Sequence, residues 1–176
     1  RGELYGLEWQ DVDFDKSTIT VNRTSQHTAK AGTYTDTPKT RSSQRCLKVT
    51  EAVMAMLTKY KVWQTEQRLK AGDKWMESGR LFVTWDGRPQ NPNSCENWLI
   101  RFCQRTEMRR VSIHSFRHLN ATLLIGAGTD IRTVSAVLGH SQASTTLNIY
   151  AHSFAAQQAA ASEAVANVLE LHKEKE

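Results

Sequence analysis

The amino-acid sequence predicts a mainly α-helical fold with a small three-stranded antiparallel β-sheet. After residue 50, apolar residues recur at helical spacing through most of the chain. Between residues 18 and 49 the chain instead has short runs rich in β-branched and aromatic residues, which favour strands. Its 176 residues suffice for one domain. We therefore expect a single domain over residues 1–176, with a core at 1–152 and a helical tail at 153–176.

The first half contains the predicted sheet. Leu4, Leu7 and, less regularly, Trp9 are spaced like the end of a helix, which an aspartate-rich turn terminates. Turn-forming residues then separate three expected strands, which together suggest a small antiparallel meander. These strands are residues 18–24, 33–38 and 45–49. A helix follows from residue 51 to about 71, where Gly72 is placed to stop it.

The second half is predicted to be helical after a short extended piece at 81–85. Asn91 as a cap and Pro92 at the first helical position open a helix with one apolar face. That apolar face consists of Cys95, Trp98, Leu99, Phe102 and Cys103. The other face is basic, which fits either phosphate binding or an ordinary solvated helix surface.

The segment 114–125 predicts an amphipathic helix in which two groups of residues occupy opposite sides. Phe116, Leu119 and Leu123 are expected to build the core, and the other side collects His114, Arg117 and His118. After it, Asp130 should cap a short helix that ends at Gly139, with His140 just beyond. Residues 144–150 predict one more short helix, and 153–176 an amphipathic terminal helix.

The composition excludes several classes of protein. Three cysteines without CxxC spacing indicate a reduced intracellular protein without a structural zinc site. No run approaches the roughly twenty apolar residues that cross a bilayer, so we expect no membrane partner. The 23 lysines and arginines outnumber 18 aspartates and glutamates, and the net charge of +5 favours a polyanionic partner.

The residues between 114 and 150 form an inventory suited to a phosphodiester. Displacement at phosphorus needs cationic donors for the non-bridging oxygens, an in-line nucleophile and an acid for the leaving alkoxide. His114, Arg117 and His140 could supply the donors and proton-transfer groups, and Tyr150 could be the nucleophile. Each residue taken singly has a simpler explanation in surface electrostatics or core packing.

Together these residues resemble the tyrosine recombinase (phage-integrase) family. The resemblance rests on HSFRH at 114–118, LGHSQASTTLNIYAH at 138–152, RGELYGLEW at 1–9 and TPKTRSSQR at 37–45, in family order. It implies the tyrosine recombinase catalytic-domain fold. It also implies catalytic roles for Lys39, His114, Arg117, His140 and Tyr150, whereas His118 matches a frequent histidine that is not catalytic. Lys30, in the neighbouring loop, is the alternative to Lys39.

The resemblance further implies DNA as substrate. Tyr150 would attack a DNA phosphate to give a 3′-phosphotyrosyl bond, and the reverse reaction with a partner strand would exchange strands in site-specific recombination or integration. No metal or other cofactor is needed. DNA contacts are expected from Arg41, Arg101, Arg105, Arg109 and Arg110. Double-stranded DNA and a homo-tetramer assembled on it are the expected partners, with weak or no self-association without DNA.

The expected setting is the cytoplasm of a bacterium, with a bacterial or phage-encoded protein associated with the nucleoid. The long strand-turn region and the IYAH ending favour a mobile-element integrase. Two expectations concern the start of the chain. The family's N-terminal DNA-binding domains are not in this sequence, and its first catalytic arginine falls directly before Arg1, three residues before Glu3.

Two other functions compete with this interpretation. In a DNA-binding module without chemistry, the arginines contact phosphates and Tyr150 merely packs. In a metal-dependent hydrolase, His114, His118 and His140 would be ligands, but the glutamate of HExxH is missing and Arg117 would place a positive charge beside the metal.

Overall fold

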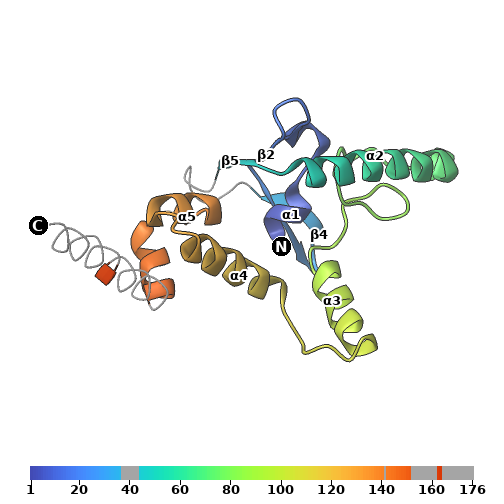
Figure 1. Cartoon of the computed structure of the whole chain (residues 1–176). Coiled ribbons are helices and arrows are strands. Elements are labelled where there is room, and N and C mark those ends of the chain that lie inside the picture. The colour runs from blue at the N-terminus through green and yellow to red at the C-terminus, as the bar shows by residue number, and fades with distance from the viewer. Residues whose placement is uncertain (37–43, 141, 152–161, 164–176) are drawn as a thin grey trace, which may run out of the picture. The chain divides into compact units, whose positions relative to one another are not determined.

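The computed structural model describes residues 1–36, 44–140, 142–151 and 162–163. The chain forms two compact units, which we call unit 1 (Arg1–Ile113) and unit 2 (His114–Glu176). Unit 1 holds the strands and the first helices, and unit 2 is helical where it is described (Figure 1). The mainly helical fold with small antiparallel sheets agrees with the sequence prediction. Lys39, Arg41 and most of the predicted terminal helix lie outside the described residues.

The three-stranded sheet of unit 1 has other members than predicted. Its order is β1 (Val12–Asp13), β2 (Thr18–Val21) and β5 (Arg45–Lys48), all antiparallel. The predicted strand 18–24 ends at Val21, because the next two residues turn their side chains to the carboxylate of Asp11 instead of continuing the sheet. The short α1 (Gly2–Gly6) and a 3₁₀ turn (Trp9–Asp11) precede this sheet.

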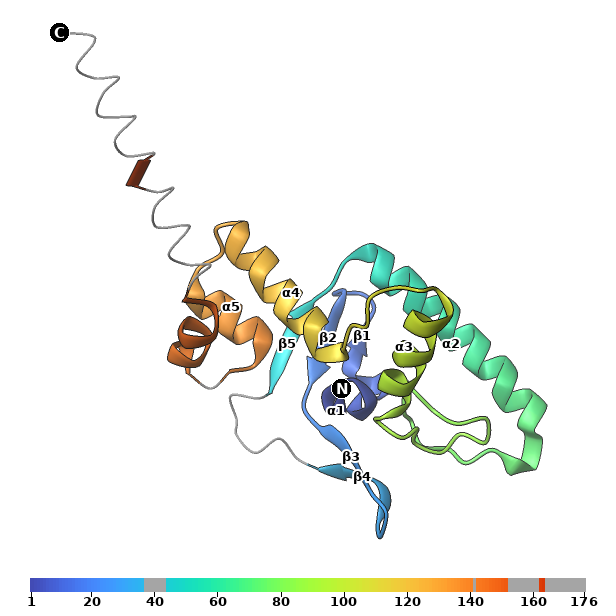
Figure 2. The ribbon, with the colours of Figure 1, turned by 90° about the horizontal axis from the view of Figure 1, so that it is seen from below.

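The predicted middle strand, 33–38, is described only as far as residue 36, and its described part belongs to a separate two-stranded hairpin. Strand β3 (Thr24–Thr28) pairs with β4 (Gly32–Asp36) in antiparallel register. This hairpin extends away from the three-stranded sheet in Figure 2. The prediction of one meander was wrong here because a local pairing across Gly32, which has a positive φ of 68°, closes a tight turn before the chain can return to β2.

Helix α1 lies close against the link between β2 and β3. A Cβ atom at Gly6 would come within 2.8 Å of the carbonyl oxygen of Arg23, so this contact requires glycine. The same region is held by ion pairs. The guanidinium of Arg23 lies 2.9 Å from a carboxylate oxygen of Glu8, and that of Arg45 bonds both carboxylate oxygens of Glu3, at 2.9 and 2.8 Å.

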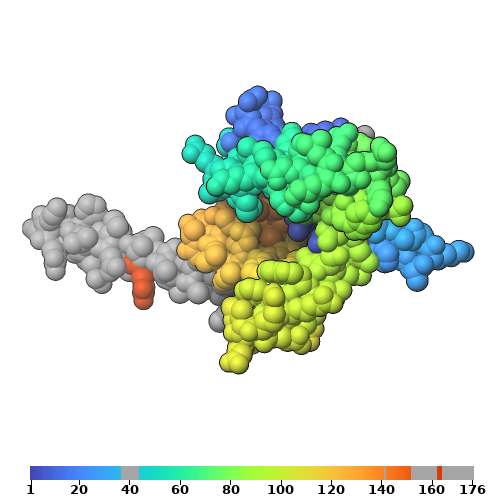
Figure 3. Space-filling view, turned by 90° about the vertical axis from the view of Figure 1, so that its right-hand side faces the viewer, coloured from blue at the N-terminus to red at the C-terminus, as the bar shows by residue number. Residues whose placement is uncertain are grey.

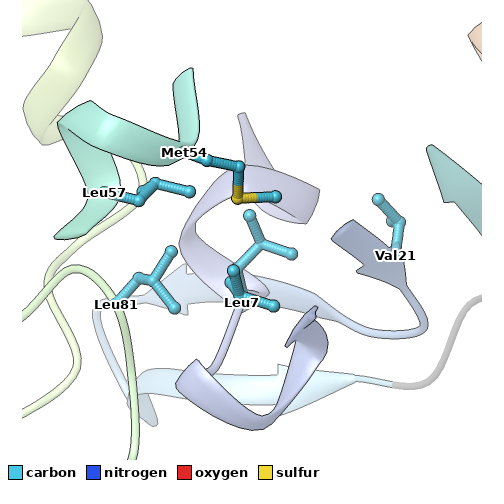
Figure 4. Packing of buried hydrophobic residues seen from close by; sticks show 6 residues of the cluster. Leu7, Val21, Met54, Leu57 and Leu81 are labelled. Atoms are coloured by element: carbon cyan, nitrogen blue, oxygen red, sulfur yellow. The ribbon is translucent and has the colours of Figure 1, made fainter. Parts of the chain in front are cut away.

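Helix α2 (Glu51–Ala71) confirms the prediction for this segment, including its end at Gly72. Its first turn is capped by Thr50, whose hydroxyl accepts the Val53 N–H. Met54 and Leu57 of α2 meet Leu7, Val21 and Leu81 in the core of unit 1, where these side chains point toward one another (Figure 4). The predicted extended piece at 81–85 is reduced to a bridge between Val83 and Pro89.

Helix α3 (Ser94–Arg105) starts two residues later than predicted. The N-cap residue is Asn93, and the side-chain oxygen of Asn91 accepts the Asn93 N–H at 2.9 Å in the turn that precedes the helix. Leu99 and Cys103 are buried as expected, but Trp98 of the same predicted face is 58% exposed and stacks on Phe102. All three cysteines are free thiols.

Unit 2 has a compact core at α4 (Ile113–Gly126) and α5 (Ile131–Leu138), followed by helical residues 143–151. The prediction of which α4 face is buried was wrong: Phe116, Leu119 and Leu123 are all more than half exposed. The buried residues are Ala121 and Ile125, both fully enclosed. Helical periodicity locates apolar positions, but the buried side is the one that packs on Val134 and Leu138 of α5, and it carries Ala121 and Ile125.

Candidate active site

The buried side of α4 leads to Arg117, one of the residues for which the sequence predicts a catalytic role. Residues 117, 121 and 125 are four apart and so share one side of the helix. Ala121 and Ile125 pack with Val134 and Leu138 of α5 and with Tyr150. Arg117 was expected on the side of α4 opposite the core, but it continues the line of the core residues Ala121 and Ile125. This places its side chain between solvent and the interior of unit 2.

Tyr150 lies in this core with only 7% of its surface exposed. Its hydroxyl is 2.8 Å from Nδ1 of His118, and the two rings are 5.7 Å apart between centroids. Burial raises the pKa of the Tyr150 phenol, and the positive charge of Arg117 acts in the opposite direction. Tyr150 is therefore held as a protonated phenol with an imidazole at its oxygen.

The two histidines of α4 lie one turn apart and form an edge-to-face pair. Their ring centroids are 4.6 Å apart and the planes meet at 88°. Both histidines are exposed, whereas Arg117 between them is half-buried. Sequence reasoning set His118 aside, but the structure places its ring against both His114 and Tyr150.

Arg117 is anchored to the end of α5. Its Nη2 donates a hydrogen bond to the carbonyl oxygen of Leu138, in the last turn of that helix. Helix α5 is fixed at both ends as the sequence predicted: the carboxylate of Asp130 accepts the N–H groups of Arg132 and Thr133, and Gly139 is left-handed with φ 71°. Two caps thus define where the carbonyl partner of Arg117 lies.

His140 follows the left-handed Gly139 and is held by a buried pair of hydroxyls. Its Nδ1 is 2.8 Å from Oγ1 of Thr146, which is fully buried. The Ser135 hydroxyl donates to the same oxygen at 2.6 Å. Sequence reasoning missed both hydroxyl residues. The available signal was position, since Thr146 precedes Tyr150 by four residues and must share its buried side of the helix.

The described arginines predicted to contact DNA are in unit 1. All are exposed: Arg101, Arg105, Arg109 and Arg110. They lie at the end of α3 and directly after it, a region that is yellow-green to yellow on the space-filling surface (Figure 3). Arg101 and Arg105 line a surface depression together with Gln104 and the exposed Trp98.

Over the described residues, no group of three or more His, Cys, Asp or Glu side chains is arranged to hold a metal ion. No helix in the described ranges is both long and apolar enough to span a membrane.

The order of these residues along α4, α5 and the helix of Tyr150 matches a known family. A model described as "Phage integrase family" matches residues 1–157. The chain belongs to the phage integrase family. The resemblance noted in the sequence is thereby confirmed at the level of the family.

Several curated phage-integrase relatives are similar over most of this chain. A "Tyrosine recombinase XerC-like" protein of Caldanaerobacter subterraneus subsp. tengcongensis is 32% identical over 163 residues, covering 86% of this chain and 42% of that protein. The "ICEBs1 integrase" of Bacillus subtilis is 27% identical, covering 89% of this chain and 42% of the relative. The chain thus spans less than half the length of these curated relatives.

Solved structures of phage-integrase relatives share the fold. The Tn1549 transposon integrase, in complex with transposon right end DNA, matches with a TM-score of 0.77 at 25% identity, covering 94% of this chain and 54% of that one. The XerA recombinase matches with a TM-score of 0.60 at 24% identity, covering 83% of this chain and 46% of that one. The predicted tyrosine recombinase catalytic-domain fold is confirmed.

Proposed function

We propose that this chain is the catalytic part of a site-specific DNA recombinase that cuts and rejoins strands through Tyr150. The observation that carries the proposal is the grouping of Tyr150, Arg117, His118 and His140 within unit 2 of a phage-integrase chain. A purely structural tyrosine needs no such neighbours. The curated relatives named as recombinases and integrases support the same assignment.

In the proposed reaction, the Tyr150 oxygen attacks a DNA phosphorus while the bond from phosphorus to the 5′-oxygen breaks. The product is a 3′-phosphotyrosyl bond and a free 5′-hydroxyl, and the reverse reaction with another strand rejoins the DNA. Arg117 and His140 bind the non-bridging oxygens, where charge builds up in the transition state. His114 or Lys39 is the proposed proton carrier. The linkage conserves the energy of the broken bond, so the reaction needs no cofactor.

Double-stranded DNA is the proposed substrate. The Tn1549 integrase is described in complex with transposon DNA, which supports this choice. The exposed arginines of α3 and residues 106–110 can bind phosphates, and the exposed Trp98 beside Arg101 and Arg105 adds a surface on which a base or sugar can pack. Arg41 is proposed as a further phosphate contact.

Four copies are proposed to assemble on DNA, with little self-association in its absence, and residues 153–176 are proposed to dock on a neighbouring copy. Removing residues 154–176 should then leave strand cleavage intact and impair synapsis, measured as paired DNA ends in a native gel. Unchanged synapsis would contradict the docking role.

We place the protein in the bacterial cytoplasm with the nucleoid, as the relatives from Bacillus subtilis and a staphylococcal phage suggest.

The decisive experiment is capture of the covalent intermediate. The chain, extended by Met-Arg so that it includes the arginine expected directly before Arg1, is incubated with nicked duplexes of randomised sequence. Protein–DNA species that survive SDS are recovered and digested for mass spectrometry. Recombinase chemistry predicts a nucleotide on the peptide that carries Tyr150, and none from Tyr150→Phe protein that still binds DNA. Binding without any covalent species would favour the DNA-binding module, and cleavage abolished by a chelator would favour a metal-dependent hydrolase.

A further inference from the structure

The Tyr150 hydroxyl meets an imidazole that the family resemblance treats as non-catalytic. Nδ1 of His118 lies 2.8 Å from the Tyr150 oxygen, within the range of a good hydrogen bond. A candidate base must be within this reach of the proton it removes. His118 meets this geometric condition in the structure as it stands.

The environment of Tyr150 makes a base necessary. Burial raises the pKa of its phenol, so the attacking oxygen carries its proton at neutral pH. That proton must leave as the oxygen–phosphorus bond forms. Arg117 favours the phenolate electrostatically, but a guanidinium remains protonated and cannot accept the proton.

The other described histidines of unit 2 are placed for different work. Nδ1 of His140 is occupied by the Thr146 hydroxyl, which belongs to a buried pair with Ser135. The His114 ring meets the ring of His118 edge to face, with centroids 4.6 Å apart, so it supports the orientation of the imidazole that contacts the Tyr150 hydroxyl. His118 is thus positioned between His114 and the nucleophile.

We propose that His118 is a catalytic residue that accepts the phenolic proton of Tyr150 during strand cleavage. The proton moves from the Tyr150 oxygen to Nδ1 of His118, and the freed electron pair forms the bond to phosphorus. The 5′-oxygen leaves with the electrons of the broken bond and takes a proton from another acid of the site. On rejoining, the His118 imidazolium returns its proton to Tyr150. This inference rests on the proposed function.

The first test measures the direction of the hydrogen bond and requires no DNA. Nitrogen-15 NMR of the imidazole rings, at a pH where His118 is neutral, reports which ring nitrogen holds the proton. We expect Nδ1 to be the bare, hydrogen-bonded nitrogen with the proton on Nε2, and the Nδ1 resonance to move in Tyr150→Phe protein. A proton on Nδ1 would mean that His118 donates to the tyrosine, which overturns the proposal.

The second test separates proton transfer from positioning. In His118→Asn protein the side-chain oxygen can keep a hydrogen bond to Tyr150 but cannot take up the proton, whereas His118→Ala loses both. Covalent-complex yields are measured against pH. All variants are made in the chain extended by Met-Arg, which supplies the catalytic arginine expected directly before Arg1. Asn120→Ala, at an exposed position of α4, is the matched control. We expect both His118 variants to lose about 10²-fold or more at neutral pH and to recover as the pH rises.

The outcomes distinguish this inference from the proposed function. If the extended protein with His118 in place forms no phosphotyrosyl bond, the recombinase function fails. The NMR result then still decides whether His118 can accept the proton. If the unmodified protein reacts and His118→Asn reacts equally well, the role is positioning alone and the inference is wrong. A flat pH profile in both His118 variants would also overturn it.

Discussion

His140 and Thr146 are joined by a hydrogen bond of 2.8 Å whose threonine end is fully buried. The bond ties the residue after the left-handed Gly139 to the helix that carries Tyr150, four residues further on. Thr146 also accepts a hydrogen bond from Ser135 of α5. A single hydroxyl therefore sets the position of His140 relative to both α5 and the nucleophile.

Replacing Thr146 with valine should impair catalysis without removing any group that contacts DNA. Valine has nearly the same shape but lacks the hydroxyl, so Ser135 and Nδ1 of His140 lose their partner. Leaving buried polar groups unpaired costs about 1–3 kcal/mol. We expect Thr146→Val protein to have lower thermal stability and a reduced covalent-complex yield. Thr146→Ser protein keeps the hydroxyl and should be close to the unsubstituted protein in both measurements. A Thr146→Val protein that cleaves normally would show that His140 does not depend on this bond.

Arg117→Lys tests the role of the guanidinium. Lysine keeps the charge but loses the planar set of donors that allows one residue to bond the Leu138 carbonyl and a phosphate together. The covalent-complex yield should fall by about 10²-fold, the scale of losing one preorganised donor, while DNA affinity changes little. Equal losses in yield and affinity would identify Arg117 as an ordinary phosphate contact.

The exposed arginines predict a steep dependence of DNA binding on salt. Each neutralised phosphate contributes about −0.9 to the slope of log affinity against log salt. Arg101→Ala and Arg105→Ala should each make this slope shallower by about 0.9, the value of one lost phosphate contact. The affinities are measured by fluorescence anisotropy. Lys70→Ala, an exposed cation at the end of α2, serves as the control and should leave the slope unchanged. A salt-independent affinity would exclude a phosphate-binding role for this surface.

Burial of Tyr5 predicts a loss of stability in alkali. Burial, together with the nearby Cys95, raises the pKa of Tyr5 to about 12, above its ordinary value of 10.0. Between these two values the folded state keeps a proton that the unfolded state loses, so this stabilising contribution is complete below pH 10 and falls until about pH 12. Between pH 10 and pH 12, unfolding of Tyr5→Phe protein should release one proton fewer than unfolding of the unsubstituted protein. The slope of the free energy of unfolding against pH should be shallower by that amount. Tyr34→Phe, an exposed position, is the control; an unchanged slope in Tyr5→Phe would contradict the assignment.

Those parts of the fold that depend on local signals were predictable from the sequence, and those that depend on packing between elements were not. The helices at 51–71 and 131–138, with their caps, follow from periodicity and capping chemistry, because those signals are local. The buried face of α4 does not follow, because it depends on which neighbour approaches. The same holds for the hairpin of β3 and β4, where two pairings compete and a tight turn decides.

The candidate site was predictable where spacing along the chain carried the information. Arg117, His140 and Tyr150 stand out by their order, and the structure brings them into one unit. Thr146 and His118 do not stand out, because their importance comes from a hydrogen bond across the fold. Lys39 and Arg41 lie outside the described residues, so their roles stay predictions from the family resemblance.

The family resemblance implies a catalytic arginine directly before Arg1. Arg1 precedes α1 and its carbonyl oxygen accepts the N–H of Tyr5, so one further residue would continue this turn beside Glu3. Glu3 is fixed by its two bonds to Arg45, which gives the turn a rigid base. We expect the 176-residue chain to fold and bind DNA weakly but to cleave poorly. Adding Met-Arg before Arg1 should raise the covalent-complex yield by about 10²–10³-fold, the value of a preorganised charged donor. The chain extended by Met-Ala is the matched control, since it supplies the same length without the guanidinium. Equal yields from the two extended proteins would show that this position is not the first catalytic arginine, and full activity of the unextended chain would assign that role to Arg1.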